Sequence, residues 1–341
     1  MAKTSDTNVQ KEPQHMRSIS KIIYHRVGFL LSLALLLLAA ALSGEALAAK
    51  GQPSQTTFAS PEEARQALVS AVQHKDQQRL DALFGPVTKD LKPGDPVEEA
   101  AEFDHFAGHV AEGVELVKEG ENRAILAIGA EKWPFPIPLV KRGDRWLFDT
   151  AAGREEILNR RIGRNEILAI NVCRAYVQAQ HEYYDMMVAD GDQIPKYAQH
   201  LISRPGKKDG LYWPSAPGEA ASPLGPLVAK AKEEGYMAPR KAGEHGRRPF
   251  HGYFFRILKE QEKSAPGGKY KYVINGNMVA GHAFIAYPSR WGVSGVMTFI
   301  VNQSGRVYQK NLGPKTSQIA KKIKSYNPDQ SWKLVPAMKR D

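Results

Sequence analysis

The sequence predicts an α+β protein in which helices precede a curved antiparallel sheet, and a long helix then precedes an antiparallel β-meander. Two observations support this fold class. Apolar residues recur with helical spacing in residues 61–84 and again in residues 154–187. Apolar and polar residues instead alternate, between Gly- and Asn-containing turns, in residues 137–149 and 252–310.

The N-terminal residues 1–48 are predicted to be a signal peptide. Basic residues precede the uncharged apolar run VGFLLSLALLLLAAALSG, and Ala46-Leu47-Ala48 follows as a cleavage site of the A-x-A kind. An uncleaved membrane anchor is the alternative, because the run approaches the length of a short membrane span. We expect cleavage after Ala48, a polar linker at residues 49–57, and an exported, periplasmic chain.

Composition limits the partners of the exported chain. The formal charge is +11, of which the leader contributes +2 through five Lys/Arg and three Asp/Glu, and a basic chain favours anionic partners such as an acidic envelope polymer. The basic clusters lie in no recognisable nucleic-acid module, so no nucleic-acid partner is expected. Cys173 is the single cysteine, so no intramolecular disulfide can form. After the leader, no segment is apolar for long enough to span a bilayer.

Residues 58–153 form the first predicted segment. Its first helix starts at the Ser-Pro-x-Glu run of residues 60–63, where Ser can cap the helix and Pro suits the first helical position. The run QQRLDALFG predicts a second helix, residues 97–109 a weaker one, and RAILAIG a short strand. Strands 137–141 and 145–149 then flank an Arg-Gly-Asp turn.

Residues 154–341 form the second predicted segment, which begins after Ala151-Ala152-Gly153 interrupts the pattern. A long helix is predicted over residues 154–187, with Gly163 as a candidate break between two helices. The following stretch, residues 189–226, is dense in Gly and Pro and is predicted to be irregular.

The rest of the second segment reads as a meander of strands. GYFFRILK and HAFIAY alternate, and YKYVINGNMVAG carries the hairpin signal Asn275-Gly276. The run GVMTFIVNQSGRVYQKNLG predicts strand 296–301, a loop at residues 302–305 and strand 306–310. We therefore expect these residues to form part of the sheet and its core rather than a catalytic site.

Four separated motifs carry a family resemblance: PFPIPLVKRGDRWLFDTAAGREEILNRRIGRNE, YAQHLISRPGKKDGLYWP, GYFFRILKEQ and GVMTFIVNQSGRVYQKNLG. Together they resemble an exported bacterial family catalogued as domain of unknown function 2950, over roughly residues 58–336. The resemblance implies an envelope or periplasmic location and no known activity. The first segment also resembles the NTF2-like fold, and the second is similar to the globular heads of pilins, although its helix is internal and polar.

The sequence specifies no catalytic residue, no metal site and no cofactor. His105 and His109 have the i, i+4 spacing of metal ligands, but without the Glu of metalloprotease helices they are better explained as ordinary histidines. Cys173 lies on the apolar side of the long helix and behaves as a small hydrophobe. Ser294 and Ser304 lie in no nucleophile elbow.

The best binding candidates are the aromatic loops KKDGLYWP and YPSRWG, whose residues are Asp209, Tyr212, Trp213, Arg290 and Trp291. Tyr and Trp in such loops supply rigid contact area for recognition. The alternative is that the aromatic rings anchor the loops onto the sheet. A last candidate is the pair His251 and His282, which would meet if the strands that they precede were neighbours.

These features favour a non-enzymatic binding or accessory protein of the periplasm, with an envelope protein or an anionic envelope polymer as its partner. Two alternatives remain: an NTF2-like pocket that binds or acts on a small molecule, and a pilin-like assembly or interaction module.

Overall fold

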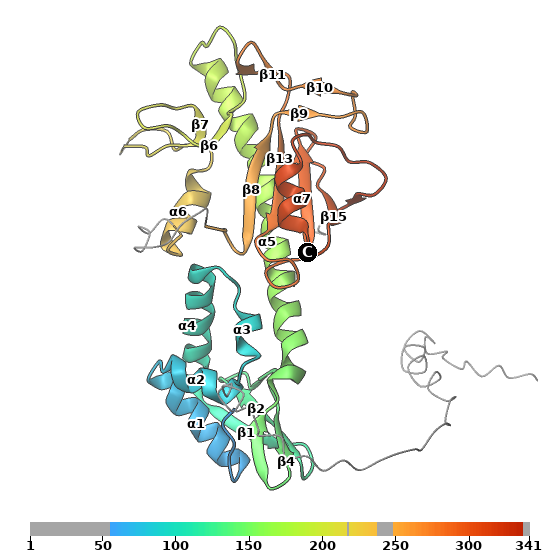
Figure 1. The fold of residues 1–341 in the computed structure, drawn as a ribbon. Helices are drawn as coiled ribbons and strands as arrows, with labels where there is room; N and C mark the ends of the chain where they lie inside the picture. The colour runs from blue at the N-terminus through green and yellow to red at the C-terminus, as the bar shows by residue number, and fades with distance from the viewer. Residues whose placement is uncertain (1–54, 217, 237–247, 337–341) are drawn as a thin grey trace, which may run out of the picture. The chain divides into compact units, whose positions relative to one another are not determined.

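The computed structural model describes residues 55–216, 218–236 and 248–336, which all belong to one compact unit of the chain. They form a mixed arrangement of helices and antiparallel sheets, so the predicted α+β class is confirmed (Figure 1). The predicted signal peptide and all of the linker except residues 55–57 lie outside the described residues. Within the described part of the chain, no helix is both long and apolar enough to cross a membrane.

Four helices open the described chain: α1 (Pro61–Gln73), α2 (Gln77–Phe84), α3 (Thr88–Leu91) and α4 (Pro96–Glu112). The predicted cap of α1 is present, because the Ser60 hydroxyl accepts a hydrogen bond from the backbone N–H of Glu63 at 3.1 Å. Asp76 caps α2 and Asp95 caps α4 in the same way. These caps fix where each helix begins, and Asp95 has further bonds described below.

The first sheet contains β1 (Val114–Lys118), β2 (Arg123–Ile128), β4 (Leu139–Arg142) and β5 (Arg145–Phe148) in that order, with β3 (Trp133–Pro134) also paired to β2. Strand β1 was not predicted, because VELVK is short, lacks a regular alternation of apolar and polar residues, and directly follows a helix. One face of the sheet packs on α1, α2 and α4 in a core that includes Leu68, Leu126 and Phe148. That face is filled by side chains.

Helix α5 (Thr150–Ala189) is a continuous helix of 40 residues, which corrects two expectations. It begins at Thr150, capped by Asp149, rather than after Gly153. Gly153 lies within the first turn of α5. Glycine is needed at this position because a Cβ would come within 2.7 Å of the Pro136 carbonyl oxygen. Gly163 is helical and does not break α5. The connector after α5 is less irregular than predicted, since it contains the parallel pair β6 (His200–Ile202) and β7 (Gly210–Tyr212), and α6 (Gly225–Glu233) follows it.

The predicted meander is an antiparallel sheet in the order β16-β15-β14-β13-β8. Its strands are β8 (Tyr253–Leu258), β13 (Ala283–Pro288), β14 (Met297–Asn302), β15 (Tyr308–Asn311) and β16 (Lys333–Leu334). The hairpin of β14 and β15 is confirmed, but its loop is longer than predicted, because the pairing ends at Ile300 with Tyr308. Between β8 and β13 lie the short strands β9 (Glu260–Gln261), β10 (Tyr270–Lys271), β11 (Val273–Ile274) and β12 (Asn277–Met278). The predicted Asn275-Gly276 turn joins β11 to β12.

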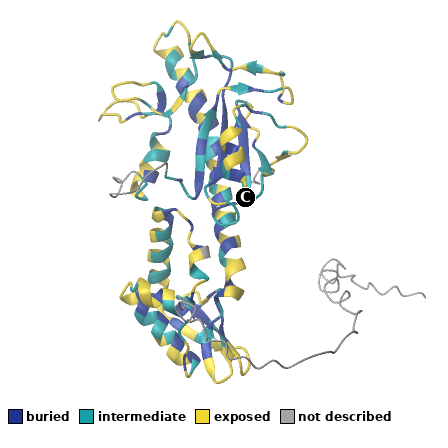
Figure 2. Cartoon of the chain, in the orientation of Figure 1, coloured by how far each residue is buried: buried dark blue, intermediate teal, exposed yellow. Residues whose placement is uncertain are grey.

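The two faces of this sheet pack against different helices. Phe255, Phe284 and Phe299 join α5 in one core, whereas Leu258 and Ile285 join α7 (Thr316–Lys322) in another. Successive residues of a strand point to opposite faces, so consecutive residues of β8 serve different cores. All of β13 and most of β14 are buried, and α5 buries residues beside them (Figure 2).

Candidate functional site

A cavity of about 270 Å³ lies between α5, α6, the β6 strand and the edge strand β8. We call it the aromatic pocket. Its wall includes aliphatic and aromatic side chains: Val172, Leu227, Val228, Phe250, Phe255 and Phe284. Tyr176, Tyr236 and Tyr253 also line it. A cavity with this lining is typical of a site for an apolar ligand.

Stacked rings form the inner wall of the aromatic pocket. Tyr176 of α5 stacks on Phe284 of β13, with ring centroids 4.1 Å apart and planes at 6°, and Phe255 stacks on Phe284 at 5.8 Å. Phe255 and Tyr253 are two residues apart in β8 and so face the same side of the sheet. The aromatic alternation of GYFFRILK therefore builds this wall.

The hydroxyl groups of the inner-wall tyrosines are engaged by the protein. Tyr176 donates to the Ala283 carbonyl at 3.2 Å, and Tyr253 donates to the Met297 carbonyl at 2.9 Å. Burial raises the pKa of both phenols above the ordinary value for tyrosine. Both residues remain neutral at physiological pH, and each has its hydroxyl bonded to a backbone carbonyl.

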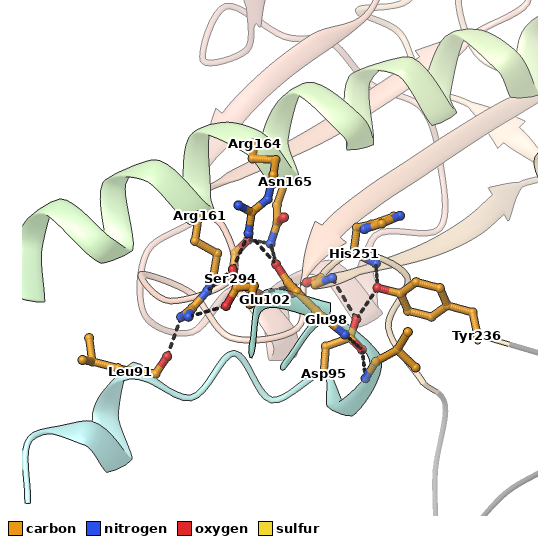
Figure 3. Close-up of polar contacts among 12 residues, drawn as sticks. Leu91, Asp95, Glu98, Glu102, Arg161, Arg164, Asn165, Tyr236, His251 and Ser294 are labelled. Carbon is orange, nitrogen blue, oxygen red and sulfur yellow. Dashed lines mark hydrogen bonds and ion pairs between the residues drawn. The ribbon is translucent and has the colours of Figure 1, made fainter. Parts of the chain in front are cut away.

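At one end, the aromatic pocket adjoins a hydrogen-bonded group that we call the junction cluster: the α4 cap Asp95, Glu98 of α4, Asn165 of α5, Gly252 and Ser294, which are buried, and the half-buried Tyr236. Tyr236 belongs to both, since its ring lines the pocket and its hydroxyl donates to Asp95 Oδ2 at 3.2 Å. Figure 3 shows how α4, α5 and the turn before β8 converge on these side chains.

Asp95 is the residue with the most connections in the junction cluster. Its Oδ1 accepts from the backbone N–H groups of Val97 and Glu98 and caps α4. Its Oδ2 accepts from Tyr236 Oη and from the backbone N–H of Gly252, each at 3.2 Å. Asp95 is 1% exposed, so these four donors, rather than water, provide the hydrogen bonds that its carboxyl group accepts. The carboxylate thus ties α4 to the segment after α6 and to the turn before β8.

Glu98 and Asn165 join α4 to α5. Asn165 Nδ2 donates to Glu98 Oε1 at 2.8 Å and to the Ser294 carbonyl at 3.2 Å. Glu98 Oε2 and Asn165 Oδ1 have no hydrogen-bond partner among the described protein residues. Burial raises the pKa of Glu98, and the bond from Asn165 opposes that effect.

Ion pairs between Glu102 of α4 and two arginines of α5 also connect these helices. Arg161 donates from Nη2 to Glu102 Oε2 at 2.9 Å and from Nε to Glu102 Oε1 at 3.3 Å, and its Nη1 bonds the Leu91 carbonyl. Arg164 also pairs with Glu102, and its Nη2 lies 3.6 Å from Glu98 Oε1. Arg161 is 6% exposed whereas the Glu102 side chain is 30% exposed, so this forked pair is partly buried and fixes the geometry of the contact.

Gly252 and Ser294 complete the junction cluster. Gly252 has φ +71°, and a Cβ there would come within 2.7 Å of Ser294 Cβ, so glycine suits both the backbone and the space. Ser294 Oγ donates to the Gly252 carbonyl at 2.9 Å and accepts from the Arg290 N–H at 3.0 Å. The serine hydroxyl thus holds two turns together.

His251 adjoins the cluster. Its Nε2 lies 2.9 Å from Glu234 Oε2, and its backbone N–H donates to Tyr236 Oη at 3.1 Å. Burial lowers the pKa of His251, and Glu234 opposes that effect. The bonds of the cluster thereby position Tyr236 against the aromatic pocket.

The structure places the predicted binding residues in two separate settings. Asp209 pairs with Arg204 (Nε–Oδ2 2.5 Å), and Trp213 is 4% exposed and packs edge-on against Tyr183 of α5. Tyr212 is half-buried in β7. Arg290 Nη1 bonds the Lys92 carbonyl, and Trp291 Nε1 donates to Asn311 Oδ1 at 2.9 Å. None of these five residues lines the aromatic pocket.

The other sequence candidates are also placed. The His105 and His109 rings lie 5.6 Å apart, and no group of three or more potential metal ligands occurs among the described residues. Cys173 is fully buried beneath the sheet, and burial raises its pKa to about 12.

The idea that His251 and His282 meet was wrong. Strands β8 and β13 are neighbours, but they are antiparallel, so the residues that precede them lie at opposite ends of the pair.

Sequence reasoning missed the residues that build the site. Asp95, Asn165 and Tyr236 are far apart in the chain, and each resembles an ordinary cap or helix-surface residue. One signal was available for part of the site: Asp95-Pro96 before a helical pattern is a capping signature. Nothing in the sequence showed that the second oxygen of that cap would reach Tyr236.

Comparison with known proteins places the chain in a family. A family model described as protein of unknown function (DUF2950) matches residues 55–335, so the chain belongs to this family. The match covers nearly every residue that the structure describes. No curated protein and no solved structure gave a match.

Proposed function

We propose that this member of the family is a non-enzymatic binding protein whose aromatic pocket takes a small apolar group, either a single ring system or a short acyl chain. The observation that carries the proposal is the pocket itself, a cavity of about 270 Å³ lined mainly by Val, Leu, Phe and Tyr side chains, with Arg248 as the charged residue among those that line it. Pockets for drug-sized ligands begin at about 300 Å³, so the volume favours a ligand of modest size.

The polar groups near the pocket support binding rather than reaction. The hydroxyls of Tyr176 and Tyr253 are bonded to backbone carbonyls. Both carboxyl oxygens of Asp95 accept hydrogen bonds from groups of the protein. A general acid or base must reach the reacting atoms, whereas these groups are engaged in holding the pocket. The junction cluster supports a preformed site by fixing Tyr236 at its end.

The face of the first sheet is a less favoured place for the ligand of an NTF2-like protein. Leu68 and Val72 of α1 pack there against Leu126 and Phe148 in one buried core. The aromatic pocket instead lies beside the second sheet. For the location of the protein, we propose export to the periplasm, because the sequence of residues 1–48 has the pattern of a leader with a cleavage site.

Binding can be tested with N-phenyl-1-naphthylamine, a neutral dye whose fluorescence rises in apolar surroundings. The unmodified protein is expected to bind it saturably, in competition with short-chain fatty acids. Val172→Phe, which adds volume to the wall of the pocket, should weaken dye binding about tenfold or more.

The matched control is Val188→Phe on the same helix, where Val188 is 52% exposed. It should bind the dye as the unmodified protein does. Equal affinities for the two variants, at unchanged thermal stability, would remove the aromatic pocket as the binding site.

A further inference from the structure

A second cavity, of about 390 Å³, lies beside β8 where that strand leads into β9. Four of its lining residues are basic: Arg256, Lys259, Lys271 and Lys324. Glu260 is the acidic residue among the lining residues, and Gln199, Ile257 and Val273 complete them. We call this cavity the basic pocket. It is distinct from the aromatic pocket, because Phe255 faces α5 whereas Arg256, the next residue of β8, faces α7.

Arg256 is held in place by the end of a helix. Its Nη2 donates to the carbonyls of Ala320 at 2.9 Å and Ile323 at 2.6 Å, at the C-terminal end of α7. Carbonyls at a helix C-terminus lack helical partners and carry partial negative charge, so a guanidinium is stabilised there. The charge of Arg256 is therefore fixed at the wall of the basic pocket.

Backbone bonds between remote segments bring the lysines to the same place. Strand β10 pairs with β9 so that Lys271 lies opposite Glu260. Tyr326 N–H donates to the Glu260 carbonyl at 2.9 Å, which brings the segment containing Lys324 alongside. Lys259 Nζ donates to Gln199 Oε1 at 3.0 Å. The pocket is thus assembled from four separate parts of the chain.

The lysine charges of the basic pocket are not paired with carboxylates among the described residues. Lys259, Lys271 and Lys324 form no ion pair there, and these three ammonium groups face the one carboxylate of Glu260. By contrast Lys269, close by in the loop before β10, pairs with Glu262 at 3.2 Å. Grouped like charges repel one another, and a cleft that contains them attracts an anion.

We propose that the basic pocket binds a phosphate group. A phosphate carries close to two negative charges at neutral pH, which suits the excess of two lysine charges over Glu260 better than a single carboxylate does. Lysine ammonium groups are usual phosphate ligands in proteins. The cavity is larger than one phosphate needs, so the group it takes is attached to a larger molecule: a soluble phosphate ester or a lipid headgroup.

The test uses inorganic pyrophosphate as a soluble probe in isothermal titration calorimetry. The full chain is expected to bind one pyrophosphate saturably, with an affinity that falls as salt is added. The double variant Lys271→Gln/Lys324→Gln should lose about tenfold or more, because each charge-assisted bond contributes a substantial part of the affinity.

The control variant Lys141→Gln/Lys232→Gln removes the same charge from exposed positions outside the basic pocket. It should bind as the unmodified chain does. Equal losses in the two double variants would show attraction by net charge alone and would overturn the proposal. Loss of structure is monitored by the thermal unfolding of each variant.

A second arm distinguishes the two sources of phosphate. Sedimentation with phosphatidic acid vesicles, whose headgroup is a phosphate monoester, against phosphatidylcholine vesicles as the reference of zero net charge, tests a lipid headgroup. Vesicle binding that requires Lys271 and Lys324 and is displaced by pyrophosphate identifies a lipid ligand. Pyrophosphate binding without vesicle binding identifies a soluble ester. Absence of binding to both probes would refute the site.

Discussion

Glu98 of α4 and Asn165 of α5 face one another in the junction cluster, with Asn165 Nδ2 donating to Glu98 Oε1 at 2.8 Å. Each side chain is buried, at 5% and 0% exposure, and each has one oxygen without a partner among the described residues. A buried carboxylate that lacks full hydrogen bonding is costly when charged. This pair therefore connects the two helices at an energetic cost that depends on pH.

Glu98→Gln should raise the free energy of unfolding at neutral pH. The pKa of Glu98 is raised in the folded protein, so the folded chain keeps a proton that the unfolded chain releases above about pH 4.5. Stability consequently falls as pH rises from about 4.5 to the folded pKa, by up to about 1.4 kcal/mol per pH unit. Urea unfolding between pH 4 and pH 8 measures this slope.

The variant should lack that part of the slope, and the exposed Glu155→Gln on α5 serves as its control. If Glu98→Gln and the unmodified chain showed parallel pH profiles, the raised pKa would not contribute to stability.

Tyr236→Phe should destabilise the protein by about 1–3 kcal/mol. The change removes the hydroxyl that donates to Asp95 Oδ2 and accepts from the His251 N–H, and leaves a buried carboxylate with one donor fewer. Thermal unfolding would measure the loss. Dye binding should weaken as well, because the ring that lines the aromatic pocket loses its anchor. A variant of unchanged stability would show that the Tyr236–Asp95 bond makes no net contribution.

The sequence predicts the second sheet better than it predicts the site, for a physical reason. The hairpin of β14 and β15 depends on local signals, namely alternation in GVMTFIVN and turn residues in QSG, which neighbouring residues supply. The junction cluster instead brings together residues 95, 165 and 294. No local pattern encodes that meeting, since it results from the packing of α4 and α5 against the turns of the sheet.

The burial of a side chain is the other property that the sequence did not predict. Trp213 and Trp291 both occur in sequence segments that contain Gly and Pro. In the structure, Trp213 is 4% exposed, whereas Trp291 is half-buried and its indole N–H donates to Asn311 Oδ1. The extra length of α5 was missed for a related reason. In the sequence Gly153 resembles a helix breaker, but in the structure it lies inside α5, where the Pro136 carbonyl oxygen leaves no room for a Cβ.

The two glycines of α5 should respond to alanine in opposite ways. Gly163 has no atom within 4 Å of an added Cβ, so Gly163→Ala should stabilise the protein by about 0.5–1 kcal/mol through better helix propensity. A Cβ at Gly153 would lie 2.7 Å from the Pro136 carbonyl oxygen, so Gly153→Ala should destabilise by about 1–3 kcal/mol. Chemical denaturation of both variants compares them directly. Stabilisation by both changes would mean that α5 does not approach Pro136 as described.

Replacement of His282 should alter the stability of the protein in acid. It is fully buried among the rings of Tyr176, His181 and Tyr197, and neither ring nitrogen has a hydrogen-bond partner among the described protein residues. Burial lowers its pKa to about 3, and the nearby His181 contributes in the same direction. The unfolded chain takes up a proton below about pH 6.5 that the folded chain refuses.

Stability is therefore lost as pH falls from about 6.5 towards 3, by up to about 1.4 kcal/mol per pH unit. This direction is opposite to that expected for Glu98. His282→Leu, which is close in volume and needs no hydrogen bond, should flatten the profile in that range and stabilise the protein at pH 7 by about 1–2 kcal/mol. The exposed His105→Leu is the control. A profile of His282→Leu that stayed as steep as that of the unmodified chain would mean that His282 is already protonated in the folded state.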